Sequence, residues 1–197
     1  MNSAQSNYET LTHTLINDTV RKVVYHTLDN GFHGLTYNHP TPLDIVDKAL
    51  LFQMESGTSC IFFCGLEFEQ HGLDFIIDPC QYLEQSPIFD NLINVSSHPN
   101  WSPYIGQQIT GINCHWQDTY HIGIPLLYPK FIELEFDNQQ PVYISSPYHN
   151  QQSSAFHVNL EEMMVIFDEQ TAYDHLAGYL NDRPIHHADS QFGQLAV

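Results

Sequence analysis

Phe131-Ile-Glu-Leu-Glu-Phe-Asp-Asn-Gln-Gln-Pro-Val-Tyr-Ile-Ser145 is the stretch that decides the fold class. In its first half apolar residues alternate with acidic ones, the period of a strand with one buried and one solvent-facing side. The polar residues 137–140 then predict a turn, and Pro141 is tolerated where the next strand begins. The sequence therefore predicts a β-hairpin with an acidic outer face that carries Glu133, Glu135 and Asp137.

A second hairpin is predicted over residues 50–64, where two apolar alternating segments flank a polar turn. Its apolar positions can be laid over those of the first stretch, which predicts an internal repeat of residues 20–80 and 105–167 joined by a loop-rich connection, 81–108. The alternative is that amphipathic hairpins resemble one another without duplication. Leu51, Ile61 and Phe63 make the other face of this hairpin apolar too, so we expect it to be the more deeply buried of the two.

The remaining elements follow from periodicity, from β-branched and aromatic content, and from short apolar runs. A helix is predicted over residues 6–17, with Ser6 and Glu9 at capping-box spacing, and a second from about Asp168. Strands are predicted over residues 19–28, 73–77, 109–116 and 163–167, and Trp101 should anchor the long connection. We therefore expect an α+β fold, mainly antiparallel sheet with a helix near each terminus, as a single domain over residues 1–197.

The charge balance is the most unusual property of the chain. Five Lys and Arg residues stand against 23 Asp and Glu, for a net charge of −18, although only 14% of residues are charged. A phosphate backbone would be repelled, so we expect no nucleic-acid binding. A strongly basic protein would be attracted, and its association would be accelerated. The alternative is that the charge serves solubility or reflects a host with acidic proteins.

Location and redox state follow from the same composition. No apolar run approaches the roughly 18 residues of a membrane span, so no membrane association is expected. The first residues lack a basic segment followed by an apolar one, so we expect no secretory signal and a cytoplasmic location. Reduced thiols are then expected at all four cysteines, with Cys60 and Cys64 as core residues.

Catalytic and metal-binding motifs are not indicated, and we predict no cofactor. The thirteen histidines contain no HExxH or His-x-His spacing, and no CxxC motif is present. Neighbouring Cys114 and His115 would point to opposite faces of a strand. A metal site built by the fold from distant residues, such as His115, His121 and His149, stays open as an alternative. No nucleophile turn or phosphate-binding loop occurs, and paired acidic residues on strands are typical of solvated faces.

The acidic hairpin face is therefore the candidate functional surface. Tyrosines flank it, and their rigid amphipathic side chains are typical anchors of protein interfaces. The candidate partner-binding residues are Glu133, Glu135, Asp137, Tyr143 and Tyr148.

The sequence predicts a small, acidic α+β chain without catalytic motifs. In this overall character it resembles bacterial immunity proteins. The resemblance implies a cytoplasmic, non-catalytic module that neutralises a basic protein partner, such as a nuclease-type toxin, by covering its active site. It includes no diagnostic motif, so it assigns no residues. Two alternative hypotheses remain. One is a metal-dependent hydrolase whose metal site is built from dispersed histidines, and the other is a structural or assembly subunit that forms a homodimer through its aromatic surface.

Overall fold

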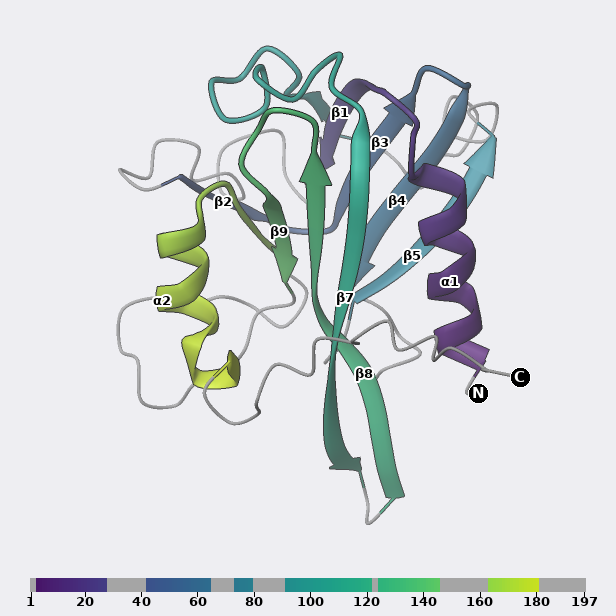
Figure 1. Ribbon diagram of the computed structural model, residues 1–197, viewed down its shortest axis with the longest axis vertical. Coiled ribbons are helices and arrows are strands. Elements are labelled where there is room, and N and C mark those ends of the chain that lie inside the picture. The colour runs from purple at the N-terminus through teal and green to yellow at the C-terminus, as the bar shows by residue number, and fades with distance from the viewer. Residues whose placement is uncertain are drawn as a thin grey trace, which may run out of the picture.

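The computed structural model describes residues 3–27, 42–64, 73–79, 91–121, 124–145 and 163–180. In this part of the chain ten strands form two five-stranded sheets, and every strand pair is antiparallel. One helix lies near each end of the described chain (Figure 1). The predicted α+β fold is thus confirmed, although the strands divide between two sheets.

The first sheet has the order β5-β4-β3-β1-β6. Its strands are β1 (Val20–His26), β3 (Ala49–Met54), β4 (Thr58–Cys64), β5 (Leu73–Pro79) and β6 (Leu92–Asn94). The second sheet has the order β2-β10-β9-β8-β7. Its strands are β2 (Leu43–Val46), β7 (Ile109–His121), β8 (Ile124–Phe136), β9 (Val142–Ser145) and β10 (Met163–Ile166).

Both predicted hairpins are present, as β3–β4 and β8–β9. Each belongs to a four-strand meander, β1-β3-β4-β5 in one sheet and β7-β8-β9-β10 in the other. The fifth strand of each sheet is added at an edge: β6 beside β1, and β2 beside β10. The two meanders share a strand order, and their common origin stays a prediction.

The main core lies between the two sheets, whose inner faces are apolar. Trp101, 0% exposed, comes from the connection between β6 and β7. Its ring lies 5.4 Å from that of Phe52 in the first sheet and 4.9 Å from that of Phe167, which follows β10 of the second. The prediction that Trp101 anchors this connection is confirmed.

Helix α1 (Ser3–Leu15) closes one side of the sandwich. The Tyr8 ring lies 4.6 Å from Phe75 of β5 and 5.0 Å from Trp116 of β7, so the helix contacts both sheets. Its hydroxyl donates to the Leu73 carbonyl. The prediction that Ser6 caps this helix is wrong, because the helix begins at Ser3 and Ser6 lies inside it.

Helix α2 (Glu169–Leu180) covers part of the outer face of the second sheet. The helix starts where predicted, and Asp168 caps it, because its Oδ1 accepts a hydrogen bond of 2.9 Å from the Thr171 amide. Ala172 and Leu176 then pack in a small second core on that face. Figure 1 shows α2 (yellow-green) beside β9, away from α1.

A buried polar cluster ties the two sheets together around Asp44, on the unpredicted strand β2. Asp44 is 1% exposed and accepts hydrogen bonds from the Tyr25 hydroxyl at 2.7 Å and from Asn100 Nδ2 at 2.9 Å. Trp101 Nε1 donates in turn to the Tyr25 hydroxyl. Burial raises the pKa of Asp44, and its hydrogen bonds oppose the rise. Because Tyr25 lies in the first sheet and Asp44 in the second, the cluster bridges them.

Candidate protein-binding face

The candidate face lies on the outer side of β7, β8 and β9. The strand register places Asn113 opposite Glu133, and Glu133 opposite Tyr143, in one row across the three strands. Residues directly opposite one another on one face of a sheet are close enough for their side chains to interact. Two predicted residues, Glu133 and Tyr143, are thus brought together, and the register adds Asn113.

Glu133 is held in place by its neighbours, and its side chain is only 21% exposed. Its Oε2 lies 3.5 Å from His115 Nε2, an electrostatic contact longer than a good hydrogen bond. The interaction with His115 is the largest cause that lowers the pKa of Glu133, whereas partial burial opposes it. Hydrogen bonds to Asn113 and Tyr143 also favour the carboxylate form. Glu133 is therefore a charged, positioned group whose direct access is limited.

Glu135 and Asp137 supply the accessible negative charge of the face. Both are exposed, and Glu135 Oε1 accepts a hydrogen bond of 2.9 Å from Asn113 Nδ2. Asn113 thus links the two glutamates, because its amide also lies 3.5 Å from Glu133 Oε2. A Cβ atom at Gly111 would collide with the Glu135 carboxylate, so Glu135 lies across β7 at a position without a side chain. Asp137 lies in the turn between β8 and β9.

Tyr143 lies beside Glu133 on the same outer side of the sheet, where α2 covers it. Its side chain is buried in the small core under α2, with Phe131 and Ile166. Burial, and then the charges of Glu133 and Glu169, raise the pKa of Tyr143 to about 12, so its hydroxyl stays protonated. The tyrosine was predicted as an interface anchor, but its ring is mostly covered. Tyr148, the other predicted tyrosine, lies outside the described residues.

His115 and Asn113 belong to this face and were not predicted for it. The His115 ring stacks on Phe131, with centroids 4.0 Å apart and planes 14° from parallel. The sequence shows that His115 and Cys114 point to opposite sides of a strand, and Cys114 does pack against the main core. Only the register with β8 reveals that His115 reaches Glu133.

Among the described residues no three His, Cys, Asp or Glu side chains gather in a way that could hold a metal ion. The histidine-based alternative rested on three residues. Of these, His115 contacts Glu133. The His121 side chain and His149 lie outside the described part, so that alternative stays a prediction.

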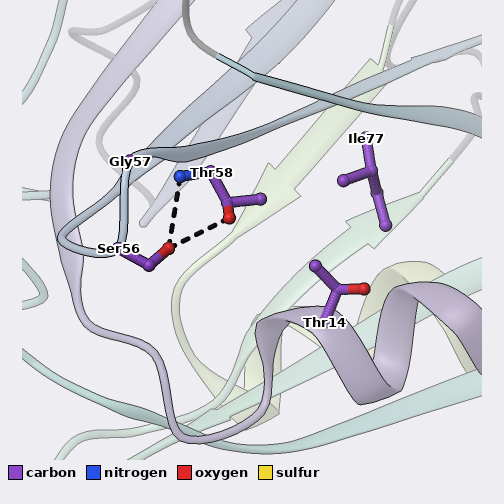
Figure 2. Close-up of a pocket in the computed structure, with 5 residues that line it drawn as sticks. All are labelled: Thr14, Ser56, Gly57, Thr58 and Ile77. Atoms are coloured by element: carbon purple, nitrogen blue, oxygen red, sulfur yellow. Dashed lines mark hydrogen bonds between the residues drawn. The ribbon is translucent and has the colours of Figure 1, made fainter.

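A shallow hollow of about 290 Å³ lies elsewhere, between the end of α1, the β3–β4 turn and β5 (Figure 2). Its polar lining consists of the hydroxyls of Thr14, Ser56 and Thr58. Ser56 Oγ donates to the Asp18 carboxylate and lies 3.2 Å from the Thr58 amide, so the Ser56 hydroxyl stabilises the turn. We assign no chemistry to this hollow.

The outer face of the first sheet is apolar, unlike the acidic outer face of the second sheet. Val24, Ala49, Leu51 and Ile61 form a buried apolar cluster there, with Leu51 5% and Ile61 7% exposed. The prediction that the β3–β4 hairpin is the more deeply buried one is confirmed. The acidic character is therefore a property of the β8 hairpin and is not shared by its counterpart.

Comparisons with known protein families, curated proteins and solved structures gave no match. Neither described helix combines the length and the apolar character of a membrane span. Geometry and charge single out the face formed by Asn113, His115, Glu133, Glu135 and Asp137, hereafter the acidic face.

Proposed function

We propose that this chain is a cytoplasmic, non-catalytic protein-binding module that neutralises a basic toxin by covering its active site. The observation that supports this proposal best is the pair of exposed carboxylates, Glu135 and Asp137, beside a third that neighbouring side chains hold in place. They lie on a chain with a net charge of −18. The resemblance to immunity proteins in overall character agrees with it.

The acidic face is preorganised for this role. Glu133 is fixed by His115, Asn113 and Tyr143, so little side-chain entropy remains to be lost at that position when a partner binds. Glu133 and Glu135 lie on β8, an interior strand of the second sheet, and this strand holds their two carboxylates on one face. Charge complementarity of this kind accelerates association and selects partners more than it adds affinity.

Neutralisation of a toxic partner is the direct test. The chain is captured with its partner from its own cells, and the partner is identified and then expressed alone and together with this chain. We expect the partner to be basic, to arrest growth alone and to be harmless in co-expression. A captured partner that remains active in the complex would contradict the proposal.

Two matched charge reversals locate the surface in the same assay. Glu135→Lys, on the acidic face, should weaken protection, whereas Glu55→Lys should not. Glu55 is also an exposed glutamate, but it lies in the β3–β4 turn of the other sheet. Equal loss of protection in the two variants would mean that overall charge matters and the acidic face does not.

A further inference from the structure

His115 is the one residue of the acidic face that can carry a positive charge. Its Nε2 atom is buried, has no hydrogen-bond partner among the described residues, and lies 3.5 Å from Glu133 Oε2. The ring stacks on Phe131, with centroids 4.0 Å apart, and this contact fixes its orientation. Solvent still reaches the His115 side chain, which is 37% exposed. A proton can therefore bind the ring, and the protonated ring directs an N–H group at the Glu133 carboxylate.

The described titratable groups that border the His115–Glu133 pair are acidic or phenolic. They come from β8, the turn after it, β9 and the start of α2: Glu133, Glu135, Asp137, Tyr143, Asp168 and Glu169. Lys130 of β8 is 3% exposed and interacts with Cys64 of the first sheet, so it is turned toward that sheet. Helix α1 contacts β7 through Trp116, which packs against the main core. A proton on His115 therefore adds a positive charge to a surface whose other charges are negative.

The neighbours of His115 keep their charge near neutral pH. Histidine is the side chain whose charge ordinarily changes between about pH 5 and 8. Glu133 stays ionised over this range, because its interaction with His115 lowers its pKa below the ordinary value of 4.5. The Tyr143 hydroxyl stays neutral, because burial and nearby carboxylates raise its pKa to about 12. The charge at the centre of the acidic face therefore changes through its histidine.

We propose that protonation of His115 releases the basic partner from the acidic face, so that the complex is tight at neutral pH and loosens in mild acid. This inference rests on the proposed function. The protonated ring pairs with Glu133 and cancels the negative charge that this carboxylate offers to a partner. It also repels a basic surface that approaches the face. Because linkage is reciprocal, a partner that prefers the neutral ring must displace the proton when it binds.

The affinity of the captured basic protein, measured at about pH 7.5 and about pH 5.5, tests the inference, because these values bracket the ordinary histidine pKa. For the wild type we expect the dissociation constant to rise about tenfold on acidification. Most of this rise should disappear in His115→Gln. It should persist in His26→Gln, which removes a histidine opposite Ala49 on the outer face of the first sheet.

Two outcomes separate this inference from the proposed function. Equal rises in the wild type and His115→Gln, or no rise in the wild type, would overturn the inference and leave the proposed function intact. Equal affinities of Glu135→Lys and Glu55→Lys at neutral pH would exclude the acidic face as the binding surface, and the inference would fail with it.

Proton release on binding distinguishes a titrating His115 from a merely structural one. Calorimetry of the complex at about pH 6, in two buffers of different ionisation enthalpy, gives the number of protons that the captured protein displaces. We expect the wild type and His26→Gln to release the same fraction of a proton, and His115→Gln to release less. Absence of proton release from the wild type would contradict the inference without any variant. Equal release from the wild type and a folded His115→Gln would also contradict it, because the displaced proton would then come from another group.

Discussion

Two carboxylates in this molecule are each hydrogen-bonded to a tyrosine, and their pKa values move in opposite directions. Asp44, paired with Tyr25, is buried between the sheets, and burial raises its pKa. Glu133, paired with Tyr143, lies on an outer face, and chiefly its interaction with His115 lowers its pKa. A carboxylate paired with a tyrosine therefore serves as an internal connection at one site and as part of a charged surface at the other. A histidine lowers the pKa at both sites, His98 at Asp44 and His115 at Glu133, but burial outweighs the favourable interactions only at Asp44.

The largest expected effect on the free energy of unfolding is at the buried Asp44–Tyr25 pair. Asp44→Ala leaves the Tyr25 hydroxyl and the Asn100 amide without their buried acceptor, so it should lower the free energy of unfolding by about 3 kcal/mol. Asp44→Asn keeps one acceptor oxygen and should cost less. Urea unfolding at neutral pH measures both. A loss below 0.5 kcal/mol, on the order of ordinary surface changes, would show that Asp44 does not connect the sheets.

The Glu133–Tyr143 pair on the outer face should contribute less to stability. Glu133→Gln removes a charged acceptor from Asn113, His115 and Tyr143, but solvent reaches this site, so we expect a loss of about 1 kcal/mol in the same unfolding measurement. If this loss equalled or exceeded that of Asp44→Ala, the contrast between the two sites would be wrong.

The two sites should also differ in the sign of their pH dependence. Because the folded state raises the pKa of Asp44, the unfolded chain releases that proton first, and stability should fall as pH rises above the ordinary value of 3.8. Because the folded state lowers the pKa of Glu133, its contribution is present above 4.5 and should be lost as pH falls through the folded pKa. Unfolding free energies of the wild type are compared across this acidic range with those of Asp44→Asn and Glu133→Gln. If the contributions of Asp44 and Glu133 to the free energy of unfolding changed with pH in the same direction, the opposite pKa shifts of the two groups would be contradicted.

The smallest stability effect is expected at the exposed carboxylate. Glu135→Gln should change the free energy of unfolding by less than about 0.5 kcal/mol, because surface substitutions usually do. Gly111→Ala should displace the Glu135 side chain without changing any charge, since the added methyl group occupies its place. Slower partner association in Gly111→Ala, with near-normal stability, would show that the position of Glu135 matters as well as its charge.

Alternating apolar residues made the two hairpins predictable, because one face of each strand lies in the core. Strand β1 was predictable from its β-branched and aromatic residues, and β10 from its strand-sized apolar run. Strand β2 could not be predicted in this way. It has four residues, and its Asp44 points into a buried cluster where the pattern requires an apolar side chain. The three residues of β6 are too few for periodicity to show. Strand β7 runs beyond the predicted 109–116 to His121, and residues 117–121, Gln-Asp-Thr-Tyr-His, have no apolar alternation that would have indicated the extension.

Of the candidate site, only the strand that carries Glu133 and Glu135 could be predicted from the sequence. The alternation placed Glu133 and Glu135 on one face of β8, and the structure agrees. Its partners His115 and Asn113 come from β7, and a bulge one residue beyond His115 shifts the register in a way that composition does not reveal. The partial burial of Glu133 has the same origin, since it depends on side chains contributed by neighbouring strands.

The association rate of the captured basic partner, measured at low and at high salt, tests the central claim most directly. At low salt Glu135→Lys should slow association about tenfold relative to Glu55→Lys, and the difference should shrink once salt screens the charges. That result would show that the partner meets the acidic face of β8. Equal rates for the two variants at low salt would contradict the account.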